Sequence, residues 1–263
     1  MSLRDDLKSD FGIEVLVERG SGQRDDPFVI ERCSAIDATR TQINLLRGLE
    51  RGRLEMWRLL KCEPAEEVAP SLQRLRIEAI SFTQSDVITE TRGYYFDVSR
   101  VDGMPDAGTP LIEWADPRTT FSAVSQIGWL HFDKAIDNSQ DRNVLDTSLL
   151  YSGLGAKATI YVYGSVVRSA QEFKFEECRS NELQSACDKV LALHPNAEKP
   201  WPVLLLEPFV LQHFLIGQDV SVAGIAVLGP HYLKLRLTYF DELKMRGLMS
   251  DTVRELARLA LKN

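Results

Sequence analysis

Apolar and polar residues alternate over the segment 232–239, and this alternation constrains the fold more than any other feature of the sequence. The odd positions of the segment hold three leucines and a tyrosine, and the even positions hold Lys234, Arg236 and Thr238 after Tyr232. A period of two is that of a β-strand with one face buried. More strand-like segments precede it, separated by short turns: 203–206, 210–215 and 220–227. Because short turns join antiparallel neighbours, we predict an α+β protein with a mainly antiparallel sheet.

Helices are predicted where apolar residues recur every three or four positions. Ser34 and Asp37 form an approximate capping box in front of the first helix. The second helix carries its apolar stripe over 183–191. Thr252 and Glu255 also have the spacing of a capping box, so we expect the last helix to begin there.

Turn-forming residues fill the segment 102–110, which is dense in Gly, Pro and Asp. Such a stretch is typical of a boundary between two parts of a chain. We therefore predict a small N-terminal α+β subdomain over residues 1–104. Residues 111–263 are expected to form a larger α/β/α sandwich, with helices flanking the sheet.

Composition narrows the class of partner. The chain has 263 residues, a formal net charge of −7 and 44% hydrophobic residues, which is typical of a globular protein. An acidic balance argues against nucleic acid or anionic lipid as a partner. The longest apolar run, 220–229, is about half as long as a membrane helix requires. Arg40, Arg47 and Arg51 recur on one side of a helix, but glutamates interleave with them, and we expect a solvated face.

The cysteines Cys33, Cys62, Cys178 and Cys187 include no C-x-x-C pair and are too sparse for a disulfide framework. We expect free thiols in a reducing cytoplasm, with Cys187 buried on the apolar stripe of its helix. The first residues do not form a signal peptide. A periplasmic location stays open if a leader has been removed.

Motifs for the common catalytic chemistries are incomplete. Residues 153–157 (GLGAK) lack the spacing of a phosphate-binding loop and the helix that should follow it, so they predict a tight turn before a strand. The four histidines include no pair two or four residues apart, so no strand or helix presents two imidazoles to one metal. There is no G-x-S-x-G motif. We predict no catalytic residue, no metal site and no cofactor.

One binding surface is predicted from the strands. The polar face of 232–239 presents Tyr232, Lys234 and Arg236, and the strand that starts at Ala158 presents Tyr161 and Tyr163 on one face. If the two strands are neighbours, these side chains form an aromatic and cationic patch suited to a protein or an anionic ligand. The alternative is that a helix covers the two tyrosines.

Two stretches, 25–30 (DDPFVI) and 93–99 (GYYFDVS), resemble a pattern found in bacterial proteins of unassigned function, as does 153–163. The second half, which ends in 232–239 and a helix, is similar in strand order to the PsbP-like proteins. That resemblance implies a noncatalytic α/β/α sandwich that acts in assembly or protein interaction, and it transfers no functional residue.

The sequence therefore favours a noncatalytic binding or accessory protein, with another protein as the expected partner and no prediction of oligomeric state. Two alternatives stay open. One is a hydrolase or transferase with a scattered site, such as His131 with Asp133, which stand two residues apart. The other is a small-molecule carrier with its pocket between the sheet and the last helix.

Overall fold

The structure is a computed structural model that describes residues 5, 8, 14–51, 56–65, 71–82, 87–103, 111–116, 122–140, 144–165, 175–228 and 231–260. The chain divides into two compact units, Met1–Ala115 with Ser122–Gln126 and Asp116–Phe121 with Ile127–Asn263. Residues 104–110 of the expected boundary segment 102–110 lie outside the described residues. The structure assigns residues 111–115 to the first unit, whereas the sequence placed them in the second.

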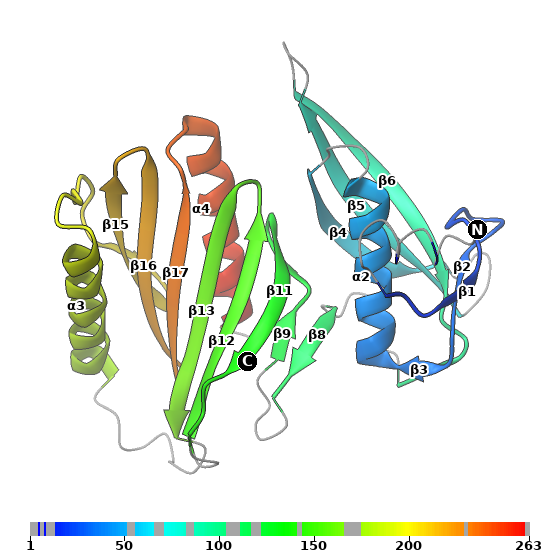
Figure 1. The fold of residues 1–263 in the computed structure, drawn as a ribbon, viewed down its shortest axis with the longest axis horizontal. Coiled ribbons are helices and arrows are strands. Elements are labelled where there is room, and N and C mark those ends of the chain that lie inside the picture. Colours follow the sequence, from blue (N-terminus) through cyan, green and yellow to red (C-terminus); the bar gives the residue numbers. More distant parts are fainter. Residues whose placement is uncertain are drawn as a thin grey trace. The chain divides into compact units, whose positions relative to one another are not determined.

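The first unit combines helix α2 (Ala35–Arg51) with a five-stranded sheet in the order β1-β2-β6-β5-β4 (Figure 1). The strands of this sheet are β1 (Val17–Arg19), β2 (Phe28–Ile30), β4 (Met56–Pro64), β5 (Leu72–Phe82) and β6 (Val87–Asp97). Two short pairs accompany it: β3 (Cys33–Ser34) with β7 (Val101–Asp102), and β8 (Ile112–Ala115) with β9 (Ser122–Val124). The pairs β2–β6 and β3–β7 are parallel.

Helix α2 begins where the sequence predicts. The hydroxyl of Ser34 donates to a carboxylate oxygen of Asp37 at 2.7 Å and accepts from the backbone N–H of Asp37 at 3.2 Å. Leu45 and Leu46 on its apolar stripe are fully buried. The approximate capping box and the buried stripe are both confirmed.

The prediction of a solvated arginine face is wrong for part of α2. Glu50 is fully buried and accepts from Arg92 at 2.6 Å and from the hydroxyl of Tyr94. Arg47 lies 3.5 Å from the buried carboxylate of Glu113 on β8. The reason is tertiary, because α2 packs against β8 as well as against the sheet and its polar side chains find partners there.

The second unit contains an eight-stranded sheet in the order β10-β11-β12-β13-β17-β16-β15-β14. Its strands are β10 (Gln126–Ile127), β11 (Leu130–Asp137), β12 (Val144–Gly153), β13 (Ala156–Ser165), β14 (Leu204–Leu206), β15 (Phe209–Ile216), β16 (Asp219–Leu228) and β17 (His231–Phe240). In this sheet order, every pair of neighbouring strands between β11 and the edge strand β14 is antiparallel. In the β12–β13 turn, Leu154 and Gly155 have φ of 55° and 74°, so residues 153–157 form the predicted tight turn.

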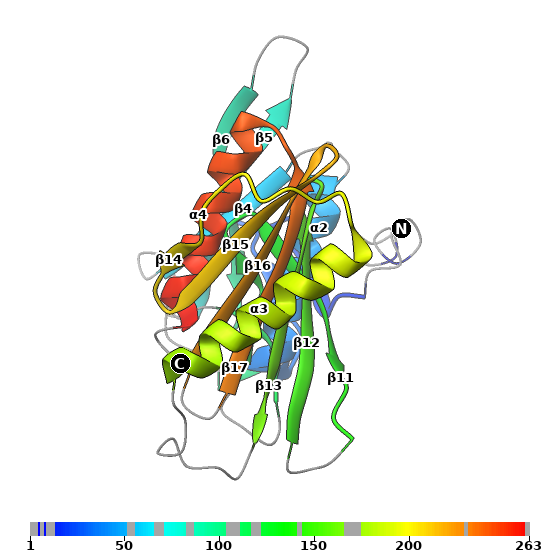
Figure 2. The same ribbon diagram turned by 90° about the vertical axis from the view of Figure 1, so that its left-hand side faces the viewer.

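Two helices cover opposite faces of this sheet (Figure 2). Helix α3 (Phe175–Leu193) packs its apolar stripe on Phe214, Ala223 and Ile225 of β15 and β16. Helix α4 (Leu243–Ala260) places Val253 and Leu256 against the opposite face. We name the two sides of the sheet the α3 face and the α4 face. The α+β class and the mainly antiparallel sheet flanked by helices are confirmed.

The expected start of the last helix is wrong. Helix α4 begins at Leu243, and Thr252 lies inside it. The hydroxyl of Thr252 accepts from the backbone N–H of Trp129 at 3.4 Å, and the carboxylate of Glu255 accepts from the N–H of Gly128 at 3.0 Å. The two side chains thus hold the turn between β10 and β11 rather than capping their own helix.

Candidate ligand-binding site on the α3 face

The register between β13 and β17 brings together the five residues predicted as a binding surface. Tyr161 lies opposite Lys234, Tyr163 lies opposite Tyr232, and Arg236 lies two residues beyond Lys234 on the same strand. Residues directly opposite each other in an antiparallel pair point to the same side of the sheet. All five side chains therefore share the α3 face, because the two strands are neighbours.

Two of these residues form an aromatic stack. The rings of Tyr163 and Tyr232 lie nearly parallel, with centroids 5.2 Å apart and an interplanar angle of 9°. Both side chains are half-buried. The hydroxyl of Tyr163 donates to the carboxylate of Glu182 on α3 at 2.9 Å. This bond connects the sheet to the helix at the edge of the surface.

Helix α3 covers only part of this face. It lies over β15 and β16, as the alternative of a covering helix expects for part of the sheet, and it leaves a cavity at Tyr161 and Tyr163. Its apolar stripe lies over β15 and β16, with Leu183 and Val190 in a buried cluster. Beside this contact a cavity of about 900 Å³ stays open between the helix and β13 and β17. We call it the aromatic–cationic pocket, and its lining residues are Asp146, Tyr161, Tyr163, Gly164, Glu182, Ala186, Lys189, Leu193, Ala223, Lys234, Leu235 and Arg236.

Positive charge is concentrated in this pocket. Lys189, Lys234 and Arg236 line it, and none of the three forms an ion pair with another described residue. Burial lowers the pKa of Lys234, the nearby charge of Lys189 lowers it further, and Glu182 partly offsets both. The Nε of Arg236 is buried without a hydrogen-bond partner among the described residues. A cluster of cations with these properties is stabilised by an anion.

The negative groups of the pocket balance this charge only in part. Glu182 already accepts the Tyr163 hydroxyl, and burial together with that bond raises the pKa of Tyr163. Asp146 lies opposite Tyr163 on β12. Three cations therefore face two carboxylates, of which one is engaged.

Sequence reasoning missed Glu182 and Lys189, which α3 contributes to this pocket. They stand seven residues apart, with Ala186 between them, so all three lie along one side of a helix. This stripe borders the apolar stripe that the sequence identified. The sequence does show charged residues beside the apolar stripe of this helix. Their role could not be inferred from the sequence, because it depends on which strands the helix covers.

The residues of the alternative catalytic site do not line this pocket. The register of β11 shifts between Phe132 and Lys134, so Asp133 is the extra residue of a β-bulge, and its side chain is exposed. Cys187 is 4% exposed, and burial raises the pKa of its thiol, so the thiolate is disfavoured at neutral pH. Within the described ranges, no three His, Cys, Asp or Glu side chains are grouped as metal ligands would be.

A second cavity, of about 340 Å³, lies between the sheet and α4. This is the position at which the carrier alternative places a pocket.

Comparison of the chain with protein-family models, with curated proteins and with solved structures found no match. No helix in the described part of the chain is long and apolar enough to cross a membrane.

Proposed function

We propose that this is a noncatalytic binding protein whose aromatic–cationic pocket takes an anionic group of its partner, a carboxylate or a phosphate. The observation that carries the proposal is the set of three cations, Lys189, Lys234 and Arg236, around one open cavity without an ion-pair partner among the described residues. Charge-assisted bonds to an anion would satisfy them.

The stacked tyrosines support the same proposal. Tyr163 and Tyr232 offer an aromatic platform next to the cations. Tyrosine and arginine are enriched where proteins bind other proteins, and this surface presents both tyrosines together with Arg236. Because the chain as a whole carries a net charge of −7, an acidic partner would be attracted only locally, which favours recognition at this pocket over general binding of polyanions.

We infer that the partner is an acidic segment of another protein, in an accessory role. The resemblance in strand order between the second half of the sequence and the PsbP-like proteins implies a role in assembly or protein interaction, and it favours the same proposal. The buried thiols Cys62 and Cys187 fit a reducing cytoplasm.

The test is a titration with two anionic probes, fluorescein-labelled hexaglutamate followed by anisotropy and phenyl phosphate followed by calorimetry. We expect binding of at least one probe, and binding that weakens as salt rises. The double variant Lys234→Gln with Arg236→Gln should weaken it at least tenfold. This variant should still fold, because it removes a cation whose pKa burial and repulsion lower.

Lys157→Gln is the matched control, since Lys157 lies on β13 opposite Thr238 and outside the pocket lining. It should leave the affinity unchanged. Binding of hexaglutamate alone identifies a protein segment as the source of the anion, and binding of phenyl phosphate alone identifies a small molecule. The proposal fails if neither probe binds, or if the double variant binds as the wild type does.

A further inference from the structure

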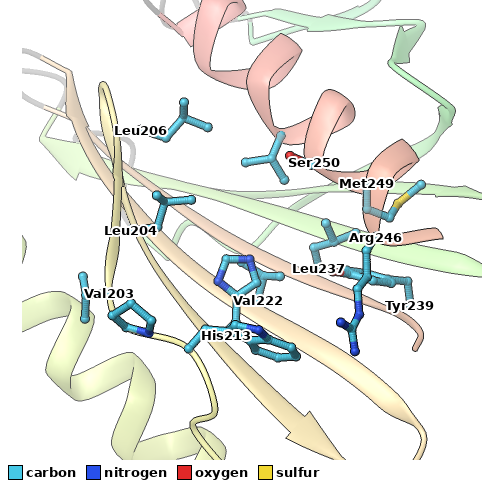
Figure 3. A pocket seen from close by; sticks show the side chains of 13 residues that line it. Val203, Leu204, Leu206, His213, Val222, Leu237, Tyr239, Arg246, Met249 and Ser250 are labelled. Atoms are coloured by element: carbon cyan, nitrogen blue, oxygen red, sulfur yellow. The ribbon is translucent and has the colours of Figure 1, made fainter. Parts of the chain in front are cut away.

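The cavity on the α4 face is separate from the aromatic–cationic pocket and has a different lining. Val222, Leu237 and Tyr239 form its floor on the sheet, and Met249 and Val253 reach it from α4. Figure 3 shows His213 and Val222 on the strands facing Met249 and Ser250 on the helix. Its volume of about 340 Å³ lies within the range of about 300–1,000 Å³ typical of small-molecule sites. We call it the apolar cavity.

The segment 201–203 and strand β14 close one side of this cavity. Trp201, Pro202 and Val203 line it together with Leu204 and Leu206 of β14. The segment is fixed to β15, because the side chain of Gln212 donates to the carbonyl of Trp201 at 3.1 Å and Glu198 exchanges two backbone bonds of 2.9 Å with Leu215. The apolar cavity is therefore bounded by ordered structure on the sheet, helix and segment sides.

The one charged side chain among the lining residues is already neutralised. Arg246 makes a two-pronged ion pair with Asp241, at 2.6 and 2.7 Å, and lies 5.1 Å over the ring of Trp201. The bond to Arg246 lowers the pKa of Asp241, and the same bond raises the pKa of Arg246. An anionic ligand would have to compete with Asp241, which disfavours acids as occupants.

Three uncharged polar side chains, those of His213, Tyr239 and Ser250, line the apolar cavity. Ser250 is exposed to solvent, whereas His213 is half-buried and Tyr239 is buried, and neither of these two side chains forms a hydrogen bond with another described residue. Burial lowers the pKa of His213 and raises that of Tyr239, so both are neutral at pH 7. Polar groups in apolar surroundings are stabilised by a ligand that can hydrogen-bond to them.

We propose that the apolar cavity binds an uncharged, mainly apolar small molecule that carries a hydroxyl or carbonyl group. The apolar part lies on Val222, Leu237 and Met249, and the polar group bonds to His213 or Tyr239. Val203 and Leu204 are 54% and 49% exposed at the edge of the cavity, so an apolar ligand can enter past them. This site goes beyond the proposed function and does not depend on it.

The experiment uses the full chain and two uncharged probes. N-phenyl-1-naphthylamine becomes fluorescent in an apolar site, and 1-naphthol competes with it through one hydroxyl. We expect saturable fluorescence enhancement, and displacement by 1-naphthol at lower concentration than by naphthalene. His213→Phe keeps a ring at this position but removes the hydrogen-bonding nitrogens. It should lower the ratio of the displacing concentration of naphthalene to that of 1-naphthol at least threefold.

Val222→Phe fills the apolar cavity and should weaken binding of the fluorescent probe at least tenfold. Val227→Phe is the matched control, because Val227 lies on the same strand, pairs with Tyr232 and therefore points to the α3 face. Thermal unfolding of each variant shows whether it is folded. If Val222→Phe does not fold, the His213→Phe comparison decides.

Two results overturn the proposal: the absence of saturable enhancement with the wild-type chain, or equal enhancement with Val222→Phe and Val227→Phe. The double variant Lys234→Gln with Arg236→Gln should bind the uncharged probe as the wild type does. Failure of the aromatic–cationic pocket and failure of the apolar cavity are thus distinguished.

Discussion

The two faces of the eight-stranded sheet carry cavities of opposite character, although the same strand contributes to both. On β17, Lys234 and Arg236 face α3, whereas Leu237 and Tyr239 face α4. Successive residues of a strand point to opposite sides. The alternation that predicts a strand therefore also sorts charge to one cavity and apolar surface to the other.

The two helices create these cavities by being anchored at different places. Helix α3 is anchored on β15 and β16, and its pocket opens beside β13 and β17. Helix α4 shares the lining of a small cavity with Leu130 and Ile160 through Leu256, and its larger cavity lies near β15 and β16. Phe214, which anchors α3, and Gly128, which lies against α4, line neither of the two binding cavities, so stability and binding can be tested separately.

The largest effect is expected at the anchor of α3. Phe214 is fully buried in the cluster with Leu183 and Val190. Phe214→Ala should lower the free energy of unfolding by about 4 kcal/mol, because it removes a large apolar side chain and leaves a cavity. Urea denaturation followed by circular dichroism measures it. Phe240→Ala is the control, since Phe240 is 45% exposed and its loss should change stability by less than about 0.5 kcal/mol. Equal losses would show that α3 is not anchored at Phe214.

The anchor of α4 is tested at Gly128. This residue has φ of +58°, and a Cβ there would meet the hydroxyl of Thr252 and come within 2.8 Å of its Cα. Gly128→Ala should destabilise the protein by about 3 kcal/mol, because the left-handed backbone is strained by a side chain and the helix must also shift.

Gly247→Ala, within helix α4 itself, is the matched control, because a Cβ at Gly247 meets nothing within 4 Å. It should raise stability by about 0.5–1 kcal/mol, since alanine favours the helix. Thermal unfolding compares the two variants. A harmless Gly128→Ala would mean that the bonds from Thr252 and Glu255 do not fix α4.

These anchors show where sequence reasoning succeeds and where it stops. The strand 232–239 and the helix start at Ser34 were predicted because their signals are local: a period of two, and a side chain bonding to the backbone three residues on. Thr252 and Glu255 have the same spacing, yet they bond to Trp129 and Gly128. Spacing alone cannot distinguish a cap from a tertiary bond.

The candidate sites follow the same division. The faces of Tyr161 and Lys234 were predicted from the period of two in each strand, whereas the adjacency of the two strands was only a condition, which the register between β13 and β17 meets. Lys189 and Glu182 were missed because their place depends on where α3 crosses the sheet. For the apolar cavity, a position between sheet and last helix was one of the open alternatives, but the contribution of Trp201 was not foreseen, since it depends on how that segment is fixed to β15.

A smaller effect is expected at the bond between the α3 face and its helix. Tyr163→Phe removes the hydroxyl that donates to Glu182 at 2.9 Å. The loss should be about 1.5 kcal/mol in the free energy of unfolding, because a hydrogen bond to a charged group is removed at a half-buried position. Freed from Tyr163, Glu182 can balance Lys234, so binding of hexaglutamate should also weaken. Tyr161→Phe is the control, since Tyr161 has no hydrogen bond to another described residue. If the two variants behave alike, the bond to Glu182 contributes nothing.

The pH dependence of stability should separate the two faces, with the smallest effects of all. Burial lowers the pKa of His213 below 6.5, so the unfolded chain binds more protons just below that pH and stability falls as the solution is acidified from pH 7. His213→Phe should flatten this fall, and part of the remaining fall belongs to His231, whose pKa burial also lowers.

Lys234 affects stability at the alkaline end of the pH range. Because its folded pKa lies below 10.5, Lys234 contributes stability that grows as pH approaches that value. The thiols of Cys62 and Cys187, whose pKa values burial raises above 9, contribute stability that is lost over the same range. Lys234→Gln should therefore make the alkaline fall in stability steeper while leaving the acid limb unchanged. Urea midpoints from pH 5 to 10 measure both limbs. An acid limb that changes with Lys234→Gln but not with His213→Phe would contradict the assignment of the two titrations to opposite faces.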